Sequence, residues 1–152
     1  MGDAAGNGLG EVGDVSAFMR ATGLVIDDAT GTRVSGHMDL GSEHHTPHGI
    51  VHGGVYAAAV ESAASIGASL AVRDRHEQAV GLTNTTHFLR AMTAGSVRVE
   101  AVALHQGRTQ QLWQVDILDA RDRLVARGEV RVQNLPGGRV PGGTSHADPP
   151  AV

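Results

Sequence analysis

One apolar segment constrains this chain more than any other feature. Residues 53–72 read GGVYAAAVESAASIGASLAV, in which Glu61 is the only charged residue. Glycines open the segment and charged residues follow it, which favours a helix from Gly53 or Gly54 to about Val72. An Ala-rich helix can lie close against a sheet, so the rest of the chain is expected to supply one.

The remaining sequence alternates apolar and polar residues, as strands do. Turn sequences such as QGRT and DARD separate the later runs, so neighbouring strands are expected to pair antiparallel. The predicted fold class is therefore α+β, with one long central helix against an antiparallel sheet of five to six strands. The expected strands are Leu24–Ile26, Arg33–Leu40, Ala79–Leu89, Ser96–His105, Gln110–Leu118 and Leu124–Gln133.

The 152 residues have the length of one domain. Composition divides them into a Gly-rich segment 1–13, a folded domain 14–135 and a Pro/Gly-rich tail 136–152. Both terminal segments are expected to be disordered. The domain is expected to open with a short helix that Asp14 caps and Gly23 ends.

Charge and residue usage argue against several classes of protein. The net charge of −4 disfavours a basic nucleic-acid binder, and the lack of cysteine removes disulfides, thiolate catalysis and cysteine metal sites. The N-terminus has no basic region followed by an apolar run, so no signal peptide is predicted. The longest weakly polar run, residues 51–72, contains His52, Glu61 and three serines, which is too polar for lipid. A cytoplasmic protein with neither a membrane nor a nucleic-acid partner is expected.

Glu61 is the first candidate for chemistry. It stands among alanines and valines, and neither Lys nor Arg lies within four positions to pair with it. Burying a carboxyl group without a partner is costly and makes it a better base near neutral pH. The alternative is a place on a solvated stripe, but we find no polar stripe along this helix. Ser65, one turn later, can hydrogen-bond the carboxylate or a water, or simply be a small residue in tight packing.

The second candidate is His52-Gly53-Gly54, where the helix is expected to begin. Free backbone N–H groups and the helix dipole favour developing negative charge there, although a plain Gly-rich cap remains the alternative. Gly53 and Glu61 are eight residues apart, about 12 Å along one helix. Both can act on one substrate carbonyl only if they come from two chains packed antiparallel.

A histidine-rich loop offers a competing interpretation. Residues 41–50 read GSEHHTPHGI, and imidazoles in such a tract can bind a metal. Pro47 disfavours the helix that would bring two of them to one face, and the only carboxylate in the loop is Glu43. We rank metal binding well below the other interpretation and predict no metal site. The candidate ligands would be His44, His45, His48 and His52.

The runs GIVHGGVYAAAVESAAS and NTTHFLRAMTAGSVRVEAVALHQGRTQQLWQV resemble the hotdog-fold thioesterases of the PaaI type. Within them they resemble the 4-hydroxybenzoyl-CoA thioesterase branch found in Arthrobacter, which places Glu nine residues after the HGG histidine, as His52 and Glu61 stand here. The resemblance covers about residues 16–133. It implies a long helix wrapped by an antiparallel sheet, a homodimer with shared active sites and often a homotetramer. The substrate it implies is an acyl-CoA or aryl-CoA, hydrolysed to free acid and CoA without a cofactor.

The same resemblance assigns roles to individual residues. Glu61 matches the catalytic nucleophile or general base, and Gly53 the N–H that polarises the thioester carbonyl. His52 matches the histidine before that glycine, and Ser65 a hydroxyl that assists the water or the carboxylate. Guanidinium groups bind phosphate through forked hydrogen bonds, which suits the implied CoA contacts. The substrate-binding residues would be Arg90, Arg108, Thr109 and Gly54.

One position departs from the family. Six residues before the HGG histidine, relatives carry Gln or Asn to orient the thioester, and here Thr46 stands there. His45 or His48 can take over that task, or the acyl group differs. Two other functions stay open: a non-catalytic hotdog that binds acyl-CoA, and a hydratase of the same fold. A binding module does not need the carboxylate, and a hydratase would want an Asp/His pair that HGG does not supply.

Overall fold

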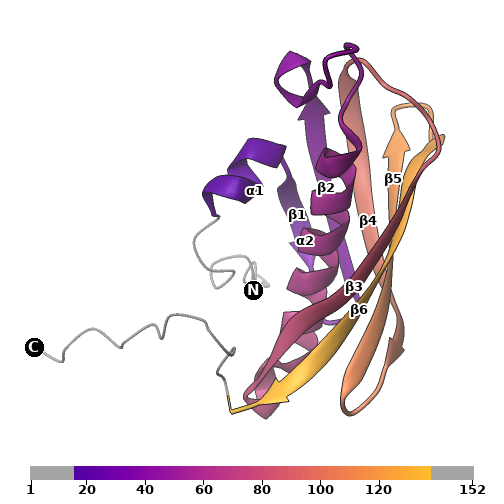
Figure 1. Cartoon of the computed structure of the whole chain (residues 1–152). Coiled ribbons are helices and arrows are strands. Elements are labelled where there is room, and N and C mark those ends of the chain that lie inside the picture. The colour runs from indigo at the N-terminus through magenta and orange to yellow at the C-terminus, as the bar shows by residue number, and fades with distance from the viewer. Residues whose placement is uncertain (1–15, 138–152) are drawn as a thin grey trace, which may run out of the picture.

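The structure is a computed structural model that describes residues 16–137 (Figure 1). The predicted disordered segment 1–13 and nearly all of the predicted tail 136–152 lie outside the described residues. Two α-helices and six strands make up most of the described fold, with short 3-10 helices at Ser42–His44 and Arg73–Arg75. The α-helices and strands are α1 (Ala17–Thr22), β1 (Val25–Ala29), β2 (Arg33–Leu40), α2 (Gly53–Val72), β3 (Glu77–Phe88), β4 (Gly95–Gln106), β5 (Gln110–Asp119) and β6 (Leu124–Pro136).

All six strands form one antiparallel sheet in the order β1-β2-β4-β5-β6-β3. The sheet curves around α2, while α1 lies beside α2 on its far side (Figure 1). β1 and β3 are the two edge strands. The predicted fold class and the six-stranded upper limit of the predicted sheet are therefore confirmed.

Small residues allow α2 to approach the sheet closely. A β-carbon at Gly67 would collide with the indole of Trp113 on β5, and one at Gly128 of β6 would lie 2.5 Å from a Val60 methyl. Side chains that are small on both surfaces therefore decide where the helix sits. The buried residues of α2 are Tyr56, Ala59, Val60, Ala63, Ala64, Gly67, Ala68 and Val72.

The first helix begins later than predicted. Ser16 caps it, accepting a 3.1 Å hydrogen bond from the backbone N–H of Met19, whereas the predicted cap, Asp14, lies outside the described residues. Gly23 ends the helix with a left-handed backbone (φ 76°), as predicted, and this conformation favours glycine.

The polarity of residues 51–72 does not exclude a membrane span by composition, contrary to the prediction from the sequence. Residues 53–75 form a helix that is long and apolar enough to cross a membrane by length and composition, with a mean hydropathy of 1.4. In the structure this helix is the core of the fold, and one face of it is covered by the sheet. The core helix of a globular protein passes the same compositional test. The apolar residues of α2 are therefore explained by its packing against the sheet.

Candidate functional site

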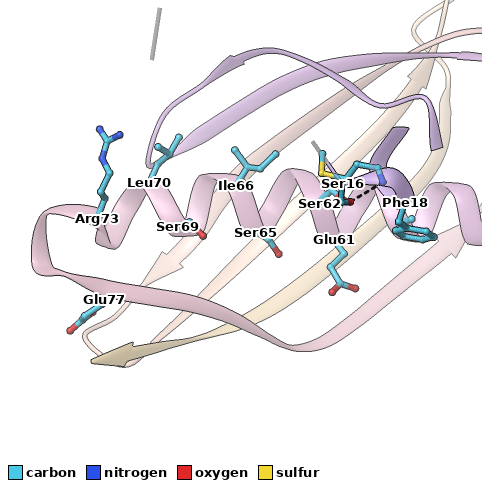
Figure 2. A pocket seen from close by; sticks show the side chains of 12 residues that line it. Ser16, Phe18, Glu61, Ser62, Ser65, Ile66, Ser69, Leu70, Arg73 and Glu77 are labelled. Carbon is cyan, nitrogen blue, oxygen red and sulfur yellow. Dashed lines mark hydrogen bonds between the residues drawn. The ribbon is translucent and has the colours of Figure 1, made fainter. Parts of the chain in front are cut away.

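A groove of about 650 Å³ runs along α2 beside α1 (Figure 2). Its lining along the helix extends from Ala58, one turn before Glu61, to Arg73, fifteen residues or about 22 Å. Apolar side chains from both helices form one side, and the hydroxyl groups of Ser65 and Ser69 form another (Figure 2). The apolar lining comes from Phe18, Met19, Ile66 and Leu70, and Ser62 lies on their side, next to α1.

Glu61 stands on a polar stripe, contrary to the sequence analysis. Glu61, Ser65 and Ser69 point to the same side of α2, at four-residue spacing (Figure 2). Glu61 is exposed, and a β-carbon at Gly81 of β3 would lie 3.6 Å from its Oε1 atom. Within one chain the carboxylate is therefore not desolvated, and any desolvation must come from a substrate or a second chain. The i, i+4 spacing of the serines was visible in the sequence and would have revealed the stripe.

The start of α2 is held by His52. Its Nδ1 accepts a 2.8 Å hydrogen bond from the Gly54 N–H, and its backbone N–H donates to the carbonyl of His44. Gly54 is predicted to bind substrate, and in this structure its N–H is already bonded to the His52 ring. Within the described residues the Gly53 N–H has no hydrogen-bond partner, as expected for the first residue of a helix.

An aromatic side chain covers Gly53. A β-carbon at Gly53 would lie 2.7 Å from the ring of Phe88, at the end of β3. This ring is 57% exposed and also contacts Tyr56, with 6.3 Å between the ring centroids. Tyr56 is buried, which raises the pKa of its phenol and keeps it protonated. Sequence analysis missed this pair, because its partners lie 32 positions apart in the chain.

Thr46 is occupied locally. Its Oγ1 accepts a 3.2 Å hydrogen bond from the His48 N–H, and its backbone N–H donates to the carbonyl of Ile50. It lies in the loop that leads to the start of α2, on the side of Gly53 rather than of Glu61. Thr46, which stands where relatives carry Gln or Asn, therefore lies near the start of α2.

The proposed CoA contacts lie at opposite ends of the sheet. The Arg90 N–H donates to the carbonyl of Val125, near the start of β6, whereas the Arg108 carbonyl accepts from Asn134, near its end. Nine strand residues separate these anchors, about 30 Å. Thr109 adjoins Arg108, and all three predicted CoA-binding side chains are exposed. One chain therefore does not bring Arg90 and Arg108 to the same phosphate group.

The histidines of the loop serve separate structural contacts. The buried His44 accepts through Nδ1 from the Gly41 N–H, at 3.2 Å, while Nε2 of His45 lies 2.5 Å from the Thr93 carbonyl oxygen. Among residues 16–137 no group of three His, Cys, Asp or Glu side chains is placed to hold a metal ion.

The comparison with known families places the chain. The model of the thioesterase superfamily matches residues 48–126, just over half of the sequence. The chain belongs to this superfamily. Its match includes the helix start and Glu61, and the predicted hotdog fold is confirmed by the family and by solved structures.

Two solved structures resemble the chain over most of its length. One is a candidate esterase of Mycobacterium tuberculosis, with a TM-score of 0.77 and 40% identity, covering 79% of this chain and 97% of that one. The other is AziG of S. sahachiroi, with a TM-score of 0.77 and 37% identity, covering 80% of this chain and 98% of that one.

Two proteins related in sequence carry names of hydrolytic enzymes. The mycobacterial protein is 51% identical over 89 residues, or 57% of this chain, and the match spans 64% of its own length. A 1,4-dihydroxy-2-naphthoyl-CoA hydrolase of Listeria monocytogenes is 34% identical over 88 residues, covering 58% of this chain and 71% of the hydrolase.

Proposed function

We propose that this chain hydrolyses acyl-CoA or aryl-CoA thioesters to the free acid and CoA. One observation carries the proposal: Glu61 stands near one end of a groove of about 650 Å³, in a chain of the thioesterase superfamily. The groove has room for an acyl group, and the carboxylate faces the place where the thioester carbonyl would lie. We also expect a cytoplasmic homotetramer built from dimers.

The catalytic groups would come from two chains. Gly53 and Glu61 are the first and ninth residues of α2, so about 12 Å of helix separates them. An attacking group and an oxyanion donor must both lie about 3 Å from one carbonyl. A two-fold dimer meets this requirement if Glu61 of one subunit faces the partner subunit's Gly53.

The edge strand β3 suits such a dimer. It pairs with β6 on one side, and its other side has no partner strand among the described residues. α2 and β3 run antiparallel, so Glu61 lies beside Gly81 and Gly53 beside Phe88. If β3 pairs with its symmetry copy about an axis that passes between the two copies of Thr85, Gly81 lies within one residue of the partner subunit's Phe88. That register brings Glu61 toward the partner subunit's Gly53 and would cover the exposed carboxylate.

The chemistry then follows from charge development. The Gly53 N–H, at the positive end of α2, would stabilise the oxyanion that forms when the carbonyl is attacked. Glu61 would either attack that carbonyl, forming a mixed anhydride as CoA thiolate leaves, or take a proton from an attacking water. In the first case water then hydrolyses the anhydride and regenerates the carboxylate. Ser65, one turn along the same stripe, would hold the water or orient Glu61. His52 would contribute by fixing the helix start.

The nucleotide of CoA would be bound by Arg90, Arg108 and Thr109. Because the two arginines lie about 30 Å apart in one chain, they would come from different subunits around one CoA molecule. A shared nucleotide site of this kind is consistent with a shared catalytic site.

The acyl group would lie in the groove beside α1. One side of the groove is largely apolar and the other carries the hydroxyl groups of Ser65 and Ser69, which suits a flat, oxygen-bearing acyl group. The name of the Listeria relative, a 1,4-dihydroxy-2-naphthoyl-CoA hydrolase, supports an aryl substrate of this type. The 4-hydroxybenzoyl-CoA branch is a second aryl candidate, suggested by the spacing of His52 and Glu61.

A non-catalytic acyl-CoA-binding protein is the second candidate function. The exposure of Glu61 favours this function. An exposed carboxylate costs little free energy, so its presence on α2 does not by itself require a catalytic role. Turnover separates the two functions. The purified chain is incubated with a panel of aliphatic and aryl CoA esters, and released thiol is measured. We expect multiple turnovers with at least one aryl ester. Tight binding of esters without turnover would contradict the proposed enzyme and support the binding protein.

A further inference from the structure

The turn between β4 and β5, residues 107–109, is held by one buried side chain. Asn134 on β6 is 4% exposed, and its Nδ2 donates to the carbonyls of Gly107 and Arg108, both at 3.2 Å. Its backbone N–H donates to the carbonyl of Thr109 at 2.8 Å. All three carbonyls of the turn are therefore directed at a single residue.

Asn134 is itself fixed from the core. Its Oδ1 accepts a 2.9 Å hydrogen bond from Nε2 of Gln111, which also donates to the carbonyl of Ala68 on α2 at 3.1 Å. Oε1 of Gln111 accepts from the indole N–H of Trp113 and from the amide of Gln106. A buried polar network with every member satisfied is rigid, so the turn is tied to α2 as well as to the sheet.

The inward carbonyls determine what the turn shows to solvent. The side chains of Arg108 and Thr109 are exposed, and within the described residues their backbone N–H groups make no hydrogen bond. Two N–H groups without a partner in the described part of the chain, a guanidinium and a hydroxyl are all donors that phosphate oxygens can accept from. Because Asn134 holds the carbonyls of the turn, these donors remain available to a ligand.

We propose that Asn134 is a positioning residue for CoA: it presets the 107–109 turn to bind the phosphates of the nucleotide. The inference rests on the proposed function, because the phosphate ligand is that of a CoA ester. A turn that contains a glycine, here Gly107, loses conformational entropy when a ligand orders it. If Asn134 already holds the turn in place, that entropy loss no longer weakens binding. Arg75 gives a weaker outer support, with its Nη2 atom 3.4 Å from the Arg108 carbonyl oxygen.

The test compares Asn134→Leu with Gln133→Leu. Leucine has the branching and the number of side-chain heavy atoms of asparagine but donates no hydrogen bond, so the carbonyls of the turn lose their common partner. Gln133 precedes Asn134 on β6, and its side chain contacts Gln110 rather than the turn carbonyls, which makes it a matched control. Binding of CoA is measured by calorimetry. Hydrolysis is measured with a CoA ester and with the pantetheine ester of the same acid, which lacks the nucleotide.

We expect Asn134→Leu to weaken CoA binding about tenfold or more and to raise KM for the CoA ester by the same factor, with kcat little changed. Neither constant should change for the pantetheine ester, and Gln133→Leu should leave all of them unchanged. A general structural defect would instead lower activity on both esters equally. If the leucine variant does not fold, Asn134→Ser, whose hydroxyl is too short to reach both carbonyls, should show the same selective loss.

Unchanged CoA affinity in a folded Asn134 variant, or equal losses on both esters, would overturn the inference while leaving the proposed function standing. A wild-type chain that neither binds CoA nor hydrolyses its esters would overturn both. The two failures are therefore distinguished by the wild-type measurement alone.

Discussion

Glu61 and Gly81 lie side by side: a β-carbon on the glycine would be 3.6 Å from Oε1 of the carboxylate. Gly81 belongs to β3, the edge strand, so the carboxylate stands next to the only side of that strand left without a partner in the described fold. A second copy of the chain pairing there would remove Glu61 from water. This relationship links the candidate catalytic residue to the proposed dimer.

Glu61→Gln should lower kcat by about 10²- to 10⁴-fold, because an amide is neither a nucleophile nor a base. Glu77→Gln is the matched control, since Glu77 is the other carboxylate that lines the groove and it pairs with Arg75. Steady-state hydrolysis of a CoA ester and a thermal unfolding curve are measured for both variants. Substantial activity in Glu61→Gln would refute the assignment, and so would an equal loss in the two variants.

Thr85→Lys should separate the subunits. Thr85 is exposed and adjoins the proposed two-fold axis, so lysines from the two subunits would lie next to each other and repel. Val25→Lys, on the opposite edge strand β1, is the control. Light scattering after size exclusion should show a smaller species for Thr85→Lys alone, with hydrolysis lost in parallel. A fully active monomer would contradict the shared site.

Arg90→Ala and Arg108→Ala should each raise KM for CoA esters about tenfold or more, with kcat changed less, because each removes a charged contact to phosphate. The effect should shrink for a pantetheine ester. Arg121→Ala removes the same charge from the β5–β6 turn and should change neither constant. Equal losses on both esters would show that the arginines support the fold instead.

Ser69→Trp should shorten the groove. Ser69 points into it two turns beyond Glu61, so an indole there would fill the distal part and spare the part next to the carboxylate (Figure 2). Hydrolysis of the longest acyl esters should fall most, whereas short esters should keep their rates. Ser69→Ala, which leaves the length unchanged, serves as the control. Uniform changes across the panel would place the acyl group elsewhere.

The sequence predicted the elements whose signals are local. Residues 53–72 match α2, and Arg33–Leu40 matches β2, because an unbroken apolar run and strict alternation are periodic over the whole element. β6 runs to Pro136, beyond its expected end at Gln133, since its last residues pair with the start of β3. Such extensions depend on the partner strand and leave no local trace.

Only the part of the candidate site that depends on local sequence could be predicted. The helix start and the spacing of Gly53 from Glu61 follow from one helix and could be derived from the sequence. The contact between Glu61 and Gly81, and the hold of Asn134 on the turn at Arg108, depend on the register between distant segments. The predicted absence of a polar stripe on α2 was wrong, and the four-residue spacing of Glu61, Ser65 and Ser69 in the sequence already indicates the stripe.

The shared site rests on one requirement, that Gly53 and Glu61 act together from different subunits. Gly53→Pro removes the backbone N–H, but its β-carbon also meets the ring of Phe88. Gly53→Ala carries the same β-carbon and keeps the N–H, so it should retain activity that the proline variant loses. Glu61→Ala supplies the complementary defect and should fold normally in an Ala-rich helix.

Mixing the two inactive variants tests this requirement most directly. Gly53→Pro and Glu61→Ala chains are refolded together, mixed dimers are verified by mass, and hydrolysis of a CoA ester is measured. In random mixing half of the dimers are mixed, and one of their two sites is intact, so activity should return to about one quarter of the wild-type value. If folded mixed dimers form and no activity returns, Gly53 and Glu61 do not act across the subunit interface.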